Sequence, residues 1–355
     1  MGFIKRDKPP RHLDKERRNL YAPPEEASYK KSLLEGPADV VVPKGAARAV
    51  PVRKGLGLRI DVPTVQGAEE GIVPLLGILA ERGARATFFL NMGPDRTGLG
   101  LGWALARPSL WCALLRRKRL SALSIRTLAS GMFLPARSAP AAAPDAFREV
   151  LDAGHELGVL PWNVRTWMDD IQRCTEERAG EEIGKALEAF RAFFGREASC
   201  FASPDCLCND ETLRFAAGQG LIFASDSRGT DPFLPVLSSG TVVNLPQIPV
   251  TLPTLPEAAS AGERLPEEAL AALPAEIARQ DWPVYQAFAE WEGRRYAGAF
   301  AAFLDGVAAA GTEIRSLGAQ LESRLEVSRV LPPCTLSYAQ MDGGLRAITQ
   351  QMFEV

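Results

Sequence analysis

Histidine is scarce in this chain, because His12 and His155 are the only two among 355 residues. A site that needs several imidazole groups therefore has few residues to draw on. No run of about 18 apolar residues without charges occurs, so we expect no membrane-spanning helix. The N-terminus lacks the apolar core of a signal peptide, and the six cysteines are too scattered for a disulfide framework. These absences predict a cytoplasmic protein.

Charge is distributed unevenly along the chain, although the net charge is only −2. Residues 1–55 carry 13 Lys/Arg against 7 Asp/Glu, while the remainder is net acidic. Residues 1–54 are also rich in proline and poor in large apolar residues, which predicts a flexible basic extension. The alternative is a basic arm that binds anionic lipid or a partner. We expect no nucleic-acid partner.

One strand–helix–strand unit stands out near the start of the apolar part of the chain. Residues 56–62 alternate apolar and charged side chains, which predicts a strand with Asp61 at its carboxyl end. Apolar side chains recur at helical spacing within residues 72–79, which predicts a helix, and Gly83 suits a left-handed cap at its end. Residues 85–90 form a second apolar run. A right-handed βαβ unit places Asp61 at the sheet edge where α/β folds carry their chemistry.

Strand and helix patterns continue to alternate, which predicts an α/β fold with a parallel sheet that closes toward a barrel. The further predicted strands are 156–160, 198–202, 221–225, 241–247, 283–289 and 312–315. The further predicted helices are 141–158, 165–194, 211–220 and 299–310.

Residues 98–135 differ in composition from the rest of the chain. Trp103, Trp111 and many leucines lie beside a cationic cluster at residues 116–119. Such a mixture is typical of an interfacial helix on anionic lipid, and we expect a membrane-interface insertion here. The alternative is an ordinary amphipathic helix that packs on the barrel.

Three stretches carry a resemblance to a known family. They are Arg-Ile-Asp-Val-Pro-Thr at 59–64, Ser-Asp-Ser-Arg-Gly at 225–229, and Gln-Ile-Pro-Val-Thr-Leu-Pro-Thr at 247–254. The chain resembles the NodB-homology polysaccharide deacetylases, and most closely their formamido-arabinose–phosphoundecaprenol deformylase branch. The resemblance implies a distorted (β/α)7 barrel over 55–326, followed by a C-terminal tail at 327–355. It also implies a lipid-linked sugar or glycolipid as the ligand.

The resemblance further implies a divalent metal, usually zinc, held by one Asp and two His, with a second Asp as the base. The base position here is Asp61. The metal-binding Asp is replaced by Pro63, and the two His positions are occupied by Leu160 and Val164. None of these three side chains has a ligand atom, so we expect no bound metal or other cofactor.

Two more family positions are changed. The acid His is replaced by Phe288, and the Trp-Arg pair that orients the base corresponds to Cys206 and Leu207. Cys206, Cys208 and the nearby Asp205 could form a replacement zinc site, although a Cys-x-Cys sequence is more often an ordinary loop.

Other residues of the resembling stretches are candidates for substrate binding. Asp226, Arg228 and Glu290 are the predicted substrate contacts, with Glu292 a further acidic candidate. Asp226 and Arg228 could equally form a structural ion pair. His155 is predicted to be structural.

These features predict a pseudoenzyme that binds a carbohydrate, a glycolipid or a protein partner. One alternative is an active hydrolase of carbon–nitrogen amide bonds in a sugar, with a rearranged metal site. Another is a membrane-surface binding module, peripheral on the inner membrane.

Overall fold

The computed structural model describes residues 54–100, 122–261, 265–341 and 346–352. The chain divides into a unit at Met1–Val50 and a compact unit at Pro51–Val355, to which the description below applies. The predicted basic extension lies outside the described residues, apart from Lys54. Residues 101–121 of the predicted membrane-interface insertion also lie outside them.

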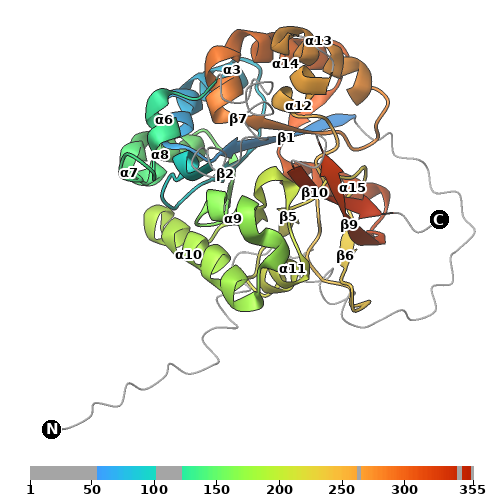
Figure 1. Cartoon of the computed structure of the whole chain (residues 1–355). Coiled ribbons are helices and arrows are strands. Elements are labelled where there is room, and N and C mark those ends of the chain that lie inside the picture. The colour runs from blue at the N-terminus through green and yellow to red at the C-terminus, as the bar shows by residue number, and fades with distance from the viewer. Residues whose placement is uncertain (1–53, 101–121, 262–264, 342–345, 353–355) are drawn as a thin grey trace, which may run out of the picture. The chain divides into compact units, whose positions relative to one another are not determined.

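A parallel sheet of seven strands forms the centre of the compact unit (Figure 1). The order is β5-β4-β3-β2-β1-β7, and β8 also pairs with β1. All the pairings are parallel, as predicted for this fold class. The strands are β1 (Gly55–Val62), β2 (Thr87–Leu90), β3 (Glu156–Val159), β4 (Cys200–Ala202), β5 (Phe223–Ser225), β7 (Val284–Phe288) and β8 (Glu313–Arg315).

The helices lie around this sheet (Figure 1). They are α3 (Ile72–Glu81), α6 (Ile125–Ala129), α7 (Ala139–Ala142), α8 (Pro144–Asp152), α9 (Val164–Asp170), α10 (Glu176–Phe194), α11 (Asp210–Ala217), α12 (Leu255–Ala261), α13 (Pro266–Ile277), α14 (Ala297–Ala309) and α15 (Leu317–Val327). Short 3-10 or π turns are η1 (Gly67–Gly71), η3 (Ile171–Arg173), η4 (Pro204–Cys206) and η5 (Trp291–Arg295). None of the described helices combines the length and apolar character that a bilayer crossing requires.

Side-chain caps explain where several of these helices begin. The hydroxyl of Thr175 accepts a hydrogen bond from the amide of Arg178 at the start of α10. Asn209 caps α11 with a capping box, and Ser316 caps α15. Each cap satisfies an amide that has no partner within the helix.

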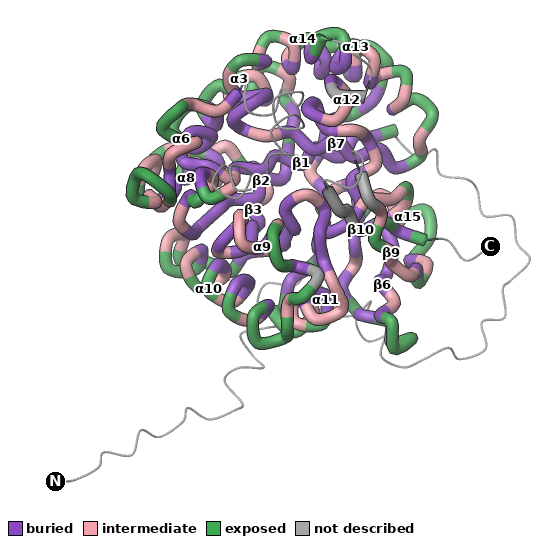
Figure 2. The backbone as a smooth tube through the Cα atoms, viewed as in Figure 1, coloured by how far each residue is buried: buried purple, intermediate pink, exposed green. Residues whose placement is uncertain are grey.

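The two faces of the sheet have different surroundings. Along β1, Leu58 and Ile60 belong to the larger apolar core, which also contains buried helix residues such as Leu75. A smaller cluster contains Phe89, Leu160 and buried residues of β4, β5 and α15. Side chains alternate along a strand, so Arg59 and Asp61 point away from the larger core. Figure 2 shows the buried strands enclosed by helices with exposed outer faces.

The sheet is open between β5 and β7, and an irregular segment fills the gap. The amide of Ile248 donates to the carbonyl of Ala224 (2.8 Å), and the amide of Leu252 donates to the carbonyl of Val284 (3.1 Å). The predicted strand at 241–247 is wrong, because this region forms only isolated bridges. Proline residues at 246, 249 and 253 have no amide to donate, which prevents a continuous ladder here.

A second, three-stranded sheet was not predicted. It has the order β10-β9-β6 and consists of β6 (Leu234–Val236), β9 (Pro333–Met341) and β10 (Arg346–Met352). β9 and β10 form an antiparallel pair, and β6 joins β9 in parallel. The segment expected as a C-terminal tail therefore contains two strands, which we call the C-terminal hairpin.

Candidate functional site

Asp61 lies at the carboxyl end of β1, beside Phe89 of β2 and Phe288 of β7. Its side chain is only 2% exposed. Arg59 binds both carboxylate oxygens, through Nε to Oδ1 (2.7 Å) and through Nη2 to Oδ2 (2.8 Å). Gln286 Nε2 donates a further bond to Oδ2 (2.8 Å). The residue predicted as the base is therefore held by three hydrogen bonds.

The guanidinium of Arg59 is completely buried and satisfied by the protein. It donates to the carbonyl oxygens of Ser203 (3.0 Å) and Ser225 (2.5 Å), in addition to Asp61. It also lies 5.1 Å from the ring centre of Phe89. Burial acts to lower the pKa of Arg59, but the charge of Asp61 and its hydrogen bonds raise it overall. Arg59 stays cationic, and the two residues form a buried ion pair.

Sequence reasoning did not recognise Arg59 as a partner of Asp61. The available signal was a cation at an inward position of an otherwise apolar strand, because buried charges are normally paired. Gln286 could not be found in this way, since it lies 225 residues further along the chain.

The family's three metal-binding positions contain no donor side chains here. Pro63 offers only its carbonyl, which accepts a bond from Asn91 Nδ2 (2.8 Å). Leu160 is buried in the smaller apolar cluster, and Val164 packs against it. Zinc sites in proteins are built from thiolate, imidazole and carboxylate groups. The residues present therefore do not fit the metal that the family implies.

Among the described residues, Cys206 and Cys208 lack the further donors that a replacement metal site would need. Both thiols are buried, and burial raises their pKa values. In the part of the chain that the structure describes, no group of three or more His, Cys, Asp or Glu could hold a metal ion. Asp205 and Cys206 adopt left-handed backbone conformations (φ 52° and 53°), which is strained for residues with a Cβ.

Asp226 and Arg228 do not pair with each other. Gln247 Nε2 donates to Asp226 Oδ2 (3.1 Å), and the Asp226 amide donates to Gln247 Oε1 (3.1 Å). Burial raises the pKa of Asp226 to about 6. Arg228 forms an ion pair with Glu257 and also donates to the carbonyl of Leu252 (2.5 Å). Both residues therefore hold loops in place in this structure.

Two buried carboxyl groups follow β7. Burial raises the pKa of Glu290 to about 8 and that of Glu292 to about 7. Glu292 accepts bonds from the hydroxyl of Tyr285 (2.7 Å) and the amide of Phe288 (2.9 Å). Glu290 Oε2 has no hydrogen-bond partner among the described residues. It lies against Gly67, where an added Cβ would be 3.0 Å from it.

Phe288 and His155 occupy structural positions. Phe288 packs against the larger core, whereas Leu160 and Val164 belong to the smaller cluster. His155 is buried, and its Nδ1 accepts a bond from the amide of Ala86 (3.3 Å). Burial lowers the pKa of His155 to about 4, so the ring is neutral at pH 7.

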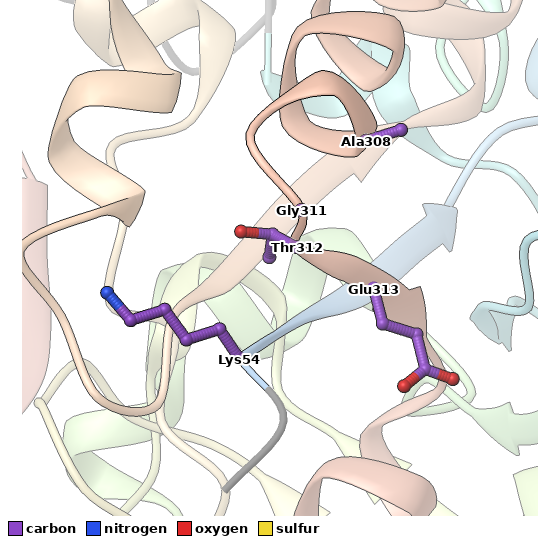
Figure 3. A pocket seen from close by; sticks show the side chains of 5 residues that line it. All are labelled: Lys54, Ala308, Gly311, Thr312 and Glu313. Carbon is purple, nitrogen blue, oxygen red and sulfur yellow. The ribbon is translucent and has the colours of Figure 1, made fainter. Parts of the chain in front are cut away.

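Two cavities of the described surface lie away from Asp61. One, of about 470 Å³, is lined by Lys54, Ala308, Gly311, Thr312 and Glu313 (Figure 3). The Lys54 and Glu313 side chains extend in different directions there (Figure 3). The other, of about 310 Å³, lies beside α9 and α10 and is lined in part by Trp167 and Cys174.

The fold agrees with comparisons to known proteins. Residues 61–224 match the family model of polysaccharide deacetylases. A protein of solved structure from Mycobacterium smegmatis, described as a polysaccharide deacetylase, superposes with a TM-score of 0.55 at 16% identity. The match covers 84% of this chain and 99% of that one, which shows that the two share a fold. Residues 61–224 are therefore similar in sequence to polysaccharide deacetylase domains, and the chain shares the fold of the solved protein.

Two curated relatives are described as 4-deoxy-4-formamido-L-arabinose-phosphoundecaprenol deformylases. The relative from Shewanella sediminis is 33% identical over 202 residues, which is 57% of this chain. That segment spans 64% of the length of the relative. The relative from Wigglesworthia glossinidia brevipalpis is 27% identical over 240 residues, covering 67% of this chain and 83% of the relative.

Proposed function

We propose that this chain is a catalytically silent deacetylase-family protein that binds a lipid-linked sugar rather than hydrolysing it. The observation that supports this most directly is the state of Asp61. A general base needs a free lone pair within reach of the proton that it abstracts. Arg59 and Gln286 donate three hydrogen bonds to Asp61, and its side chain is only 2% exposed, so a substrate has little access to its remaining acceptor position.

The proposal also rests on the side chains that surround Asp61. Amide hydrolysis needs an electrophile to stabilise the developing oxyanion and an acid to protonate the leaving nitrogen. The side chains at these four positions, which are Pro63, Leu160, Val164 and Phe288, supply neither an ion-binding atom nor a proton. Each missing group typically costs about 10²-fold in rate or more, so the combined loss removes useful turnover.

The proposed ligand class follows from the relatives. Both are described as deformylases of a formamido sugar carried on undecaprenyl phosphate. We propose that a sugar on a polyprenyl phosphate is also the ligand of this chain, recognised without being cleaved.

Metal content and turnover test the silent state. We expect purified protein that has been incubated with zinc and gel-filtered to retain far less than one zinc ion per chain. We also expect no chelator-sensitive release of formate or acetate from N-formyl or N-acetyl sugars. The triple variant Pro63→Asp, Leu160→His and Val164→His is the positive control for metal capture. Stoichiometric zinc and chelator-sensitive formate release by the unaltered chain would refute the proposal.

A second candidate function is hydrolysis by a rearranged, metal-independent site. It is favoured by Glu290, whose pKa of about 8 keeps a proton available at pH 7 at the end of β7. If this function is correct, amide hydrolysis should persist in excess chelator. It should also fall at least 100-fold in Glu290→Gln, which keeps the shape of the side chain but cannot release a proton. Absence of turnover in both proteins would reject this candidate.

We also propose that the protein binds peripherally to an anionic membrane. Ile125 and Phe133 are 86% and 71% exposed, and Leu99, Met132 and Leu134 are also exposed. We call these five residues the apolar face. Exposed arginines at 96 and 126 accompany it, and the sequence has no Asp or Glu between residues 95 and 145. Apolar side chains beside cations favour the surface of anionic lipid.

Co-sedimentation with vesicles tests this surface. We expect the protein to bind vesicles that contain phosphatidylserine, and to bind pure phosphatidylcholine at least fivefold more weakly. The double variant Ile125→Ser and Phe133→Ser should lose most of the binding. Val242→Ser, at an exposed apolar residue elsewhere, is the matched control and should bind normally. Equal binding by the double variant and the control would reject the apolar face as the membrane contact.

A further inference from the structure

The C-terminal hairpin is bonded to the loop that follows β4. Thr349 Oγ1 accepts a hydrogen bond from the amide of Cys208 (3.1 Å) and donates one to the carbonyl of Cys208 (3.2 Å). The hydroxyl of Tyr338, on β9, donates to the same carbonyl (2.6 Å). Three hydrogen bonds from two strands therefore converge on one residue of this loop.

The hairpin is also bonded to the loop that follows β5. The amide of Arg228 donates to the carbonyl of Thr349 (2.8 Å), and the amide of Gln351 donates to the carbonyl of Arg228 (2.8 Å). The side-chain oxygen of Gln351 accepts a bond from the amide of Thr230 (3.0 Å). Residues 349–351 thus connect the loops after two neighbouring strands.

Gly229 allows this close approach. A Cβ added there would lie 2.9 Å from the Cβ of Gln351 and closer still to its side-chain oxygen, so one of the two would have to move. A Cβ added at Gly184, in α10, would meet no atom within 4 Å. The two glycines offer a matched pair, because only the first one is in contact with the hairpin.

The bonded loops hold several buried groups that face no solvent. Cys206 and Asp226 are almost fully buried, and the hydroxyl of Ser227 has no hydrogen-bond partner among the described residues. The strained turn at Asp205 and Cys206 also belongs to the first loop. The carboxyl ends of parallel strands are where α/β folds bind ligands, so the hairpin adjoins the edge at which a ligand would enter.

We propose that the C-terminal hairpin is a releasable strap, which keeps the carboxyl ends of β4 and β5 closed and exposes their buried polar groups when it detaches. The hairpin pairs with the three residues of β6 at one end of β9, so its release must also break this short pairing. A two-stranded hairpin is only marginally stable on its own, and such elements open locally at a lower free energy than the whole domain. The strained turn favours release, because a residue held in a costly conformation relaxes once its surroundings loosen. This inference is independent of the proposed loss of catalysis.

Thiol labelling in the full-length chain tests the strap. Cys206 and Cys208 lie in the loop that the hairpin holds, whereas Cys200 is buried inside the sheet and reports opening of the whole domain. Half-buried Cys174 normalises the reaction with iodoacetamide. Labelling of each cysteine is followed over time by mass spectrometry of its peptide, since a buried thiol reacts only while it is exposed.

Two substitutions should detach the hairpin by different means. Thr349→Val removes two of the three hydrogen bonds to Cys208 while keeping the shape of the side chain, and Gly229→Ala displaces Gln351. We expect Cys208 to react with iodoacetamide at least tenfold faster in each variant than in the unaltered chain. The labelling rate of Cys200 should not change. Gly184→Ala should leave both rates unchanged.

Two outcomes overturn the proposal. One is unchanged labelling of Cys206 and Cys208 in both variants. The other is faster labelling that Cys200 shares, because that reports unfolding of the whole domain. A further measurement uses the unaltered chain and so does not rely on a variant that folds. In urea below the unfolding transition, labelling of Cys208 should depend more weakly on urea than that of Cys200, because local opening exposes less surface. Equal dependence on urea would also overturn it.

Discussion

Asp61 and Glu290 are buried carboxyl groups near the carboxyl ends of neighbouring strands, yet their surroundings are opposite. Asp61 is bonded on both oxygens by a cation and an amide. Glu290 has an oxygen without a hydrogen-bond partner in the part of the chain that the structure describes, and burial raises its pKa to about 8. Burial is shared by the two groups, so what distinguishes them is the set of partners. Asp61 forms an ion pair with Arg59, whereas burial of Glu290 disfavours its charged form.

The comparison also separates the two kinds of cost that such groups carry. The Arg59–Asp61 pair is costly to break, because removal of one member leaves an uncompensated charge in an apolar interior. Burial of Glu290 destabilises the folded protein little while the carboxyl is protonated. The destabilisation grows as pH rises and the carboxyl loses its proton. The first site should therefore respond most to mutation, and the second to pH.

The largest effect is expected from Arg59→Met, which leaves Asp61 buried without its cation. We expect the free energy of unfolding at pH 7 to fall by about 3–5 kcal/mol, as measured by urea denaturation. The double variant Arg59→Met and Asp61→Leu should lose less than the sum of the two single variants, because it leaves no lone charge. Additive losses would show that the two residues act independently.

A smaller effect is expected from Glu290→Gln. A carboxyl with a raised pKa binds its proton more tightly in the folded state, so its contribution is fully present below pH 4.5 and is lost as pH rises through about 8. Between pH 5 and pH 8 the unaltered chain should lose on the order of 3 kcal/mol more stability than Glu290→Gln. If the unaltered chain and Glu290→Gln lost stability in parallel as pH rises, this prediction would be contradicted. The control is Glu188→Gln, at an exposed position, which should follow the unaltered chain.

The smallest effect is expected from Tyr285→Phe, which removes one of the two donors to Glu292. Glu292 is buried like Glu290, but it accepts hydrogen bonds from Tyr285 and Phe288. Its surroundings are therefore intermediate between those of Asp61 and Glu290. At pH 6 we expect a loss of about 1 kcal/mol in unfolding free energy, the usual net value of one buried hydrogen bond. A loss above about 3 kcal/mol would contradict this value and would show that buried Glu292 depends strongly on the hydroxyl, because the substitution keeps the packing of the ring.

The pattern of apolar residues was enough to predict much of the fold. The seven parallel strands and the position of Asp61 at the end of β1 were predicted correctly, because buried strands and amphipathic helices repeat at fixed spacings. The C-terminal hairpin was missed, and residues 241–247 were wrongly predicted as a strand. The hairpin pairs two strands that are adjacent in the chain, and only its pairing with β6 is distant. The prolines at 246, 249 and 253 prevent a continuous ladder near 241–247.

The sequence showed which ligand side chains are replaced, but it did not show which residues contact Asp61. That Pro63, Leu160 and Val164 have no ligand atoms is a property of the side chains, and it holds in whatever way the chain folds. The engagement of Asp61 by Arg59 and Gln286 was decided only by the tertiary structure. Gln286 comes from a strand 225 residues away, and burial of the pair depends on packing from several elements. The strength of a charge–charge contact follows from that packing, because it depends on distance and on the exclusion of water.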